Sequence, residues 1–340
     1  MSLDLINKLK SKNNLSQREA KNFIDSVLQG EIKKNILTDF LKLLNAKGFC
    51  AKELTGFAEA MREVSNKVHY DGDIVDNCGT GGDGLKTFNI STTASLIASS
   101  SGVCVAKHGN KAITSNSGSA DILESAGINI KLTPQQVSVC LEKSNFGFMF
   151  APLHHSSMKY VAESRREIAP EKTIFNLLGP LTNPAGAKKQ LIGVYSESLM
   201  EIVAETLINL GTKRAMIIHS YDGMDEISIY DKTHVIEINN SEMRRYDIDP
   251  SEYFSCNSSI SSIIVNDAKQ SLAMMMSVLK NEDTPARMIS LINAAALVYL
   301  SGKSESISDG IDICKNSLET NSAYDKLNQI IELTNGFEEC

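Results

Sequence analysis

The sequence predicts an α/β protein with an N-terminal all-helical domain and a larger α/β domain built on a mainly parallel central sheet. Over residues 1–68, apolar residues recur at helical spacing and no strand pattern interrupts them. From residue 73 onward, short apolar strands alternate with helical segments, as in a parallel sheet with crossover helices. We therefore expect a helical domain over residues 1–68 and an α/β domain over residues 73–340.

The first domain shows helix start and stop signals in the right order. Ser16 followed by Glu19 is the pattern of a capping box, and apolar residues continue at helical spacing until Gly30. The same spacing predicts a second helix that carries residues 36–44 and ends near Gly48, and a third that starts around Ala51 and includes Met61. Short helices without an intervening strand indicate a small helical bundle.

The second domain contains alternating strand and helix signals. Thr133 and Pro134 are typical N-cap and first-turn residues of one connecting helix, and residues 198–210 and 267–300 predict further helices. Residues 161–186 form an excursion that is helical or irregular. The predicted strands are Ile74–Val75, Val103–Ala106, Ile128–Leu132, Phe146–Phe150, Gln190–Tyr195, Arg214–His219 and His234–Ile238.

Composition narrows the class of function. The 340 residues are 42% hydrophobic and 22% charged, which are ordinary globular values, and the net charge of −7 argues against a general nucleic-acid-binding surface. No apolar run approaches the roughly 20 residues that span a bilayer, and the N-terminus lacks the apolar core of a secretion signal. The seven cysteines are scattered singly, as free thiols in a reducing cytoplasm would be. We expect a cytoplasmic protein without nucleic-acid or membrane partners.

A glycine-rich segment follows the first predicted strand. Residues 79–84 include Gly79, Gly81, Gly82 and Gly84, and an apolar helical run begins shortly afterwards. Glycines let backbone N–H groups approach an anion closely, and a helix N-terminus adds further donors. The next strand delivers Lys107 to the same edge of the sheet. The segment therefore predicts a phosphate-binding crevice.

Other interpretations of this segment fit less well. The pattern GxGxxG also occurs in dinucleotide-binding folds, which place a carboxylate after the next strand, whereas here that strand ends in Lys107 and His108. A Walker P-loop fails because Leu85 separates Gly84 from Lys86. A glycine-rich turn without a ligand is the third alternative, although several glycines normally mark a close backbone approach.

Further polar residues follow later strands. Asp225 and Glu226 suit magnesium, which prefers a few oxygen ligands together with substrate phosphate, and Ser91 and Asp83 could add oxygens; a solvated loop is the alternative. Ser119 lies at the start of a predicted helix, where its hydroxyl either caps the helix N-terminus or binds a phosphate. The Arg165 guanidinium suits a carboxylate, with a surface salt bridge as the alternative.

Six motifs in this order resemble those of the anthranilate phosphoribosyltransferase family. They are GTGGDGLKTFNIST, KHGN, SNSGSAD, MKYVAESR, KTIFNLLGPLTNPA and GMDE. The resemblance covers roughly residues 15–300. It implies a fold of the nucleoside phosphorylase and phosphoribosyltransferase type, with residues 161–186 crossing back to the helical domain. It also implies a homodimer and a magnesium-dependent transfer from phosphoribosyl pyrophosphate (PRPP) to the amine of anthranilate.

The resemblance further implies the roles of individual residues. Ser91, Asp225 and Glu226 are implied to bind Mg²⁺, with Asp83 acting through water. Asn110 and Arg165 are implied to hold anthranilate, with His108 and His155 along its channel. The full set implied to bind the substrates is Gly79, Gly82, Asp83, Thr87, Asn89, Ile90, Ser91, Thr92, Lys107, His108, Gly109, Asn110, Lys111, Ala112, Ile113, Thr114, Ser115, Ser119, His155 and Arg165.

The implied reaction needs no strong general base, because the aromatic amine is already nucleophilic; His108 is the one candidate. The sequence departs from the family pattern at Lys111 and Lys172, where arginine is usual, and at Ser156, where proline is usual.

Two other functions are alternatives to this transfer. A pyrimidine-nucleoside phosphorylase would not need the acidic pair Asp225 and Glu226, and a non-catalytic nucleic-acid-binding relative would need a basic groove.

Overall fold

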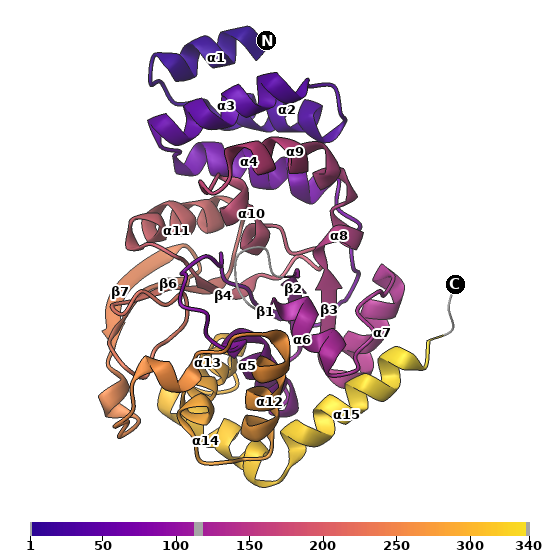
Figure 1. Cartoon of the computed structure of the whole chain (residues 1–340), viewed down its shortest axis with the longest axis vertical. Coiled ribbons are helices and arrows are strands. Elements are labelled where there is room, and N and C mark those ends of the chain that lie inside the picture. The colour runs from indigo at the N-terminus through magenta and orange to yellow at the C-terminus, as the bar shows by residue number, and fades with distance from the viewer. Residues whose placement is uncertain (1, 112–117, 338–340) are drawn as a thin grey trace.

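The computed structural model describes residues 2–111 and 118–337, with a stack of helices lying over one end of a larger α/β body (Figure 1). The predicted capping box is confirmed, because Ser16 Oγ accepts the Glu19 N–H at 3.3 Å and the Glu19 carboxylate accepts the Ser16 N–H at 2.7 Å. The stacked helices are α1 (Ser2–Lys10), α2 (Gln17–Leu28), α3 (Lys34–Lys47) and α4 (Ala51–Glu63).

The helical stack has an aromatic centre. The rings of Phe23 on α2 and Phe40 on α3 stack with their centroids 3.8 Å apart, and Phe57 on α4 lies against Phe40. All three side chains are fully buried. Each helix therefore buries its apolar stripe against its neighbours, as the helical spacing in the sequence predicts.

The described residues form a seven-stranded sheet in the order β3-β2-β1-β4-β5-β6-β7. Strands β1 to β5 pair in parallel, whereas β6 runs antiparallel to β5 and β7 antiparallel to β6. The carboxyl ends of β1, β2, β4 and β5 meet at one edge, where the segments after them converge. The strands are β1 (Val75–Asn77), β2 (Val105–Gly109), β3 (Phe146–Phe150), β4 (Lys189–Gly193), β5 (Arg214–Ser220), β6 (Thr233–Asn239) and β7 (Glu242–Ile248).

Helices cover both faces of the sheet (Figure 1). Successive side chains point to opposite faces, so Leu191 packs in the cluster that holds α5 and α13, whereas Ile192 packs with α10 and α11. No helix among the described residues is both long and apolar enough to cross a membrane. One face of the sheet carries α5 (Ile90–Ser100), α6 (Ser119–Ser125), α12 (Ala268–Leu279), α13 (Pro285–Ser301), α14 (Ile307–Glu319) and α15 (Ser322–Asn335). The other face carries α10 (Phe175–Leu181) and α11 (Met200–Asn209). Helix α7 (Pro134–Ser144) packs on β3.

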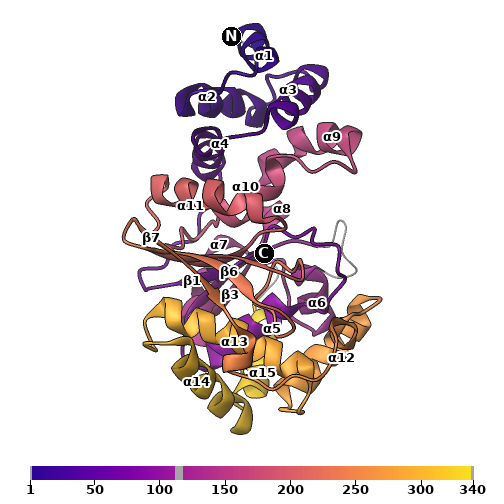
Figure 2. The same ribbon diagram turned by 90° about the vertical axis from the view of Figure 1, so that its left-hand side faces the viewer.

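The segment after β3 runs back to the helical stack. It contains α8 (Ala151–His154) and then α9 (Lys159–Ile168), which packs against α3 before the chain descends to α10 (Figure 2). One buried apolar cluster includes residues of α2, α3, α4, α9, α10 and α11. The returning excursion thus shares a core with the N-terminal helices, while the boundary between residues 68 and 73 stays a prediction.

The strand predictions differ from the structure at three places. The strand predicted over Val103–Ala106 is β2, Val105–Gly109, so Lys107 and His108 lie within it and not after its end. Residues 128–132 are not a strand: the Lys131 N–H donates to Asn129 Oδ1 and the Asn129 N–H to Thr334 Oγ1, so side chains take the place of a neighbouring strand. Strand β7 was not predicted, because its largely exposed, charged residues carry little apolar signal. The turn before it places Asn240 and Ser241 at positive φ, as a two-residue hairpin requires.

Candidate active site

The glycine loop, residues 79–84, continues directly from the carboxyl end of β1. The Cys78 N–H donates to the Leu191 carbonyl at 3.2 Å and the Thr80 N–H to the Gly193 carbonyl at 2.8 Å, so pairing with β4 extends past β1. Gly81 and Gly82 then turn the chain with φ of +63° and +85°. These are backbone conformations that residues with a side chain rarely adopt.

The acidic pair packs against this loop from the segment after β5. The Gly81 N–H donates to Asp225 Oδ2 at 2.9 Å. A Cβ atom on Gly79 would lie 2.7 Å from the same oxygen, and one on Gly193 would lie 1.6 Å from the Asp225 backbone oxygen. The close fit of three backbone segments therefore brings the predicted phosphate loop and the predicted metal ligands together.

Asp225 and Glu226 lie in an environment that disfavours their ionised forms. Desolvation raises the pKa of Asp225, and the nearby charge of Asp83 raises it further. Desolvation and the charge of Asp225 raise the pKa of Glu226 well above its usual value, although the charge of Lys107 opposes this. A cation among these carboxylates would relieve both effects.

These residues fit a magnesium ion. The described part of the chain contains no group of three or more His, Cys, Asp or Glu side chains that could hold a metal ion. Magnesium does not need such a group, because it is usually bound through one or two carboxylates together with water and substrate phosphates. The Ser91 backbone lowers the pKa of Glu226, so Ser91 lies close to the acidic pair.

Lys107 lies between the ends of the first two strands. Its side chain is only 2% exposed, and its Nζ donates to the Asn77 carbonyl and, at 3.2 Å, to Ser91 Oγ. Asn89 caps α5 by accepting the Thr92 N–H at 2.9 Å, which places the helix N-terminus beside this ammonium group. A full positive charge and a helix N-terminus therefore lie side by side, as the sequence predicts.

Other predicted phosphate ligands have more ordinary surroundings. The Ile90 side chain packs in the core, so its backbone is the part that can meet a ligand. Thr87 forms a β-bridge with Ile264. Lys111 Nζ pairs with the Glu124 carboxylate at 2.6 Å on the surface. Ala112, Ile113, Thr114 and Ser115 lie outside the described residues.

Ser119 and Asn110 lie close together across the loop that follows β2. The Ser119 hydroxyl and the Ala120 N–H both donate to the Asn110 carbonyl, at 3.4 Å and 3.1 Å. A Cβ atom on Gly109 would lie 2.1 Å from Ser119 Oγ and 2.8 Å from a ring carbon of Phe148, so a glycine lets the strand end approach the start of α6 closely. The structure thus places these three predicted residues side by side.

Buried histidines adjoin the ends of β2 and β3. The rings of His108 and His155 lie 5.1 Å apart, and His108 Nδ1 donates to the Gly179 carbonyl while His155 Nε2 donates to the Thr182 carbonyl. Desolvation lowers the pKa of His108 to about 3 and that of His155 to about 4. Both rings are therefore neutral at pH 7, and His108 Nε2 has no hydrogen-bond partner among the described residues.

We predict that His155→Gln stabilises the protein at low pH relative to the wild type. The folded state holds His155 at a pKa of about 4 instead of 6.5, so the stability present above pH 6.5 is lost as the pH falls toward 4. Glutamine does not titrate, and its Nε2–H can replace the bond to Thr182. Urea denaturation should show that, as the pH falls from 7 to 5, the unfolding free energy of the wild type decreases by about 2 kcal/mol more than that of the variant. A difference independent of pH would contradict the buried neutral ring.

Arg165 on α9 is a partly buried cation that has no counter-ion among the residues the structure describes. Desolvation lowers its pKa, and its guanidinium lies 6.0 Å from the centroid of the Phe175 ring. Within residues 2–111 and 118–337 no hydrogen bond or ion pair satisfies its side chain. A surface salt bridge is therefore not its role here, and its donors are free for a bidentate contact with a carboxylate.

Two residues of the site were missed from the sequence. Asp76 in β1 is fully buried and accepts the His108 N–H at 3.2 Å, and its desolvation raises its pKa to about 6. An acidic residue inside an apolar strand is a signal that could have found it. Gly193 gave no signal, because its close contact with Asp225 joins segments that are distant in the sequence.

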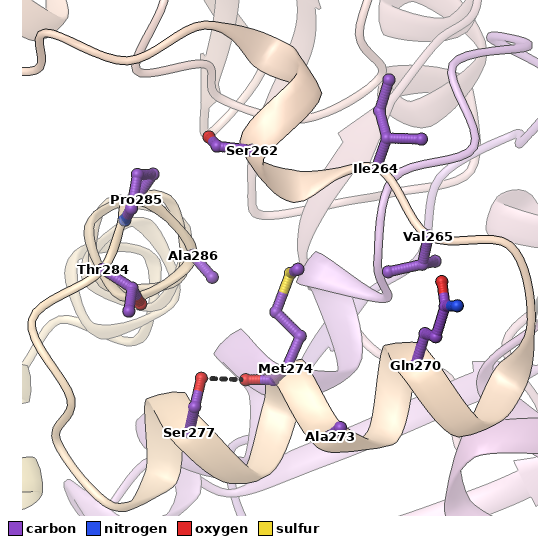
Figure 3. A pocket seen from close by; sticks show the side chains of 10 residues that line it. All are labelled: Ser262, Ile264, Val265, Gln270, Ala273, Met274, Ser277, Thr284, Pro285 and Ala286. Atoms are coloured by element: carbon purple, nitrogen blue, oxygen red, sulfur yellow. Dashed lines mark hydrogen bonds between the residues drawn. The ribbon is translucent and has the colours of Figure 1, made fainter.

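A hollow of about 390 Å³ lies away from these residues, between the segment before α12, α12 itself and α13 (Figure 3). It lies behind the chain that follows the glycine loop, since the Val265 N–H donates to the Lys86 carbonyl at 3.0 Å. None of its lining residues carries a charge, so it does not suit a phosphate. The lining residues are Ser262, Ile264, Val265, Gln270, Ala273, Met274, Ser277, Thr284, Pro285 and Ala286.

Known protein families and relatives match this chain over nearly its full length. Residues 3–65 match the helical bundle domain of the glycosyl transferase family, and residues 71–324 match its a/b domain. The chain is 41% identical over 333 residues to an anthranilate phosphoribosyltransferase of a Thermoanaerobacter species, covering 98% of each chain. It is 42% identical over 338 residues to that of Methanocorpusculum labreanum, covering 99% of each.

Solved structures give the same result. The crystal structure of anthranilate phosphoribosyltransferase from Thermus thermophilus has a TM-score of 0.92 and 32% identity, covering 98% of this chain and all of that one. The Saccharomyces cerevisiae enzyme in complex with PRPP and Mg has a TM-score of 0.90 and 28% identity, covering 99% and 98%. The match extends through both the helical bundle and the α/β sheet. The chain belongs to the anthranilate phosphoribosyltransferase family.

Proposed function

We propose that this protein transfers the phosphoribosyl group of PRPP to the amine of anthranilate, with Mg²⁺, in tryptophan biosynthesis. The products are N-(5-phosphoribosyl)anthranilate and pyrophosphate. The observation that carries the proposal is the meeting of the glycine loop, Lys107 and the pair Asp225 and Glu226 at one edge of the sheet. A phosphate-rich, metal-bound substrate suits this combination.

PRPP is proposed to lie across the glycine loop and the N-terminus of α5. Asp225, Glu226 and Ser91 would hold Mg²⁺, with Asp83 nearby, and Lys107 would add its charge to the crevice. The remaining predicted phosphate ligands, Gly79, Gly82, Thr87, Asn89, Ile90, Thr92, Gly109, Lys111 and Ser119, support this position through their places around the same strand ends. Ala112 to Ser115 retain this role as a prediction.

Anthranilate is proposed to bind between the returning segment and the strand ends. The free guanidinium of Arg165 would hold its carboxylate, and Asn110 would help to orient it. His108 and His155 would line the channel as neutral rings pinned by backbone carbonyls. Because burial keeps both rings neutral, neither adds a second positive charge that would compete with Arg165 for the carboxylate.

The reaction exchanges one bond at ribose C1 for another. The bond from C1 to the pyrophosphate oxygen breaks, with its electron pair leaving on pyrophosphate, and the amine lone pair forms the new C1–N bond. Magnesium supplies charge stabilisation to the leaving group. The chain contributes the loop N–H groups and the Lys107 ammonium at fixed positions, which is positional and electrostatic catalysis. The positively charged nitrogen then gives its proton to the released pyrophosphate or to water, because a pKa of about 3 makes His108 a poor acceptor.

We further propose a homodimer in the cytoplasm. The resemblance to the family suggests the dimer. The described cysteines are all free thiols, as in a reducing compartment. Sedimentation equilibrium should give twice the chain mass of 37.1 kDa.

A fluorescence assay tests the activity. Anthranilate emission should fall only when PRPP and Mg²⁺ are both present, and chelation of Mg²⁺ should stop the decrease. Two parallel assays test the alternatives: release of base from a pyrimidine nucleoside with inorganic phosphate, and a gel shift with nucleic acid. If emission stays constant while either parallel assay is positive, the proposed function is wrong.

We predict that Arg165→Ala raises the KM for anthranilate about 10- to 100-fold, because a charge-assisted bidentate contact is lost. The KM for PRPP should change little. Arg166→Ala is the matched control, since Arg166 is the exposed neighbour on the same helix. Equal KM values for anthranilate in the two variants would rule out the proposed role of Arg165.

A further inference from the structure

Lys172 reaches the glycine loop from outside it. The residue belongs to the returning segment between α9 and α10, and its Nζ donates to the Gly82 carbonyl at 2.7 Å. The same ammonium lies 3.4 Å from the centroid of the Tyr195 ring. A Cβ atom on Gly82 would lie only 2.9 Å from Lys172 Cε, so the lysine stem runs along bare glycine backbone.

The two ends of Lys172 are held by different parts of the fold. Its backbone carbonyl accepts a hydrogen bond from Asn45 Nδ2 on α3, at 2.8 Å. At the other end, the ammonium lies over the Tyr195 ring. The Tyr195 N–H in turn donates to Thr80 Oγ1 of the glycine loop, at 3.1 Å. One residue thereby joins the helical stack, through its backbone, to the glycine loop, through its side chain.

The charge of Lys172 faces the proposed metal and pyrophosphate position. Desolvation lowers its pKa, and the charges of Asp225 and Asp83 act in the opposite direction. Within the described residues it makes no ion pair, and the Gly82 carbonyl is its hydrogen-bond acceptor. An ammonium has three N–H donors, so donors remain for an anion bound at the loop.

We propose that Lys172 is a positioning residue for pyrophosphate, which holds the glycine loop through Gly82 and presents its remaining donors to the phosphates bound there. The inference rests on the proposed function for the identity of the anion. A lysine acts as a point charge and needs no fixed fork geometry, so it can keep both contacts while the loop adjusts. The helical stack thereby takes part in holding PRPP as well as anthranilate.

The test uses Lys172→Met, which keeps the stem and removes the charge, and Lys172→Arg, which restores the charge. In Lys172→Met, the KM for PRPP and the dissociation constant for magnesium pyrophosphate, measured by calorimetry, should each rise about 10-fold, the effect of one lost charge-assisted hydrogen bond. The KM for anthranilate should stay within about twofold of the wild type, a change too small to reflect a lost hydrogen bond. Lys172→Arg should recover most of the PRPP affinity.

Lys159→Met is the matched control, because Lys159 also lies over a tyrosine ring, 5.0 Å from its centroid, but is exposed on α9. It should leave every constant unchanged. If Lys172→Met raises both KM values equally and Lys172→Arg does not recover, Lys172 is only structural and the inference fails. If the wild type itself shows no transfer, the proposed function fails, whereas pyrophosphate binding by the same variants still tests Lys172.

Discussion

Gly193→Ala is expected to lower kcat/KM by about 100-fold or more, because displacing catalytic groups by about 1 Å has effects of this size. The new Cβ atom would lie 1.6 Å from the Asp225 backbone oxygen, and backbone cannot rotate away as a flexible side chain can. The segment carrying Asp225 and Glu226 must therefore move. That movement would also break the bond from the Gly81 N–H to Asp225.

The measurement is steady-state kinetics over a range of Mg²⁺ concentrations, together with thermal unfolding. Overpacking of this kind also costs about 1–3 kcal/mol of stability, so a control must separate the two effects. Gly310→Ala suits this purpose, because its Cβ atom would lie 2.8 Å from the Ala295 carbonyl, between α14 and α13 and remote from the site. It should lower stability and leave the Mg²⁺ dependence unchanged. A Gly193→Ala enzyme with wild-type kinetics would show that this contact does not position the acidic pair.

Local signals in the sequence predicted the elements that local chemistry determines. The capping box of Ser16 and Glu19, the N-cap Thr133 and the strand Phe146–Phe150 all agree with the structure. Each depends on residues within a few positions of one another. Residues 128–132 show the limit. Alternate residues are buried as in a strand, but side chains accept two of the backbone N–H groups and no strand among the described residues pairs with this segment.

The site residues could be predicted where a charged side chain lies near the end of a buried strand, because such a residue has few roles there other than binding a ligand. Lys107 lies near the carboxyl end of β2, whereas Asp225 and Glu226 follow β5, and the parallel topology brings those ends together. The contact of Lys172 with Gly82 and that of Gly193 with Asp225 were not predictable. The first joins residues about 90 positions apart in the sequence and the second joins residues fewer than 40 apart, and a single sequence does not show that such segments lie together. The neutral state of His108 likewise depends on burial, which a single sequence does not reveal.

Glu53→Gln is expected to reduce the unfolding free energy by about 3–5 kcal/mol, the usual effect of removing one partner of a buried ion pair. Glu53 is 0% exposed, and its carboxylate accepts the Leu15 N–H at 2.8 Å and the Cys50 N–H and Lys47 Nζ each at 2.9 Å. A glutamine of the same size has one acceptor oxygen and turns an N–H₂ group toward these donors. It also leaves the Lys47 charge buried without its counter-ion.

Glu19→Gln is the matched control, since Glu19 pairs with Lys8 at 2.8 Å on the surface, where both side chains are about one-third exposed. Screening by water limits that pair to about 1 kcal/mol or less, and glutamine can still complete the capping box. Urea unfolding at pH 7 should therefore separate the two variants clearly, and equal losses would contradict a special role for the buried pair. Because Lys47 lies two residues after Asn45 on α3, a loosened Glu53→Gln bundle should also weaken the hold on Lys172, and the KM for PRPP should rise with it.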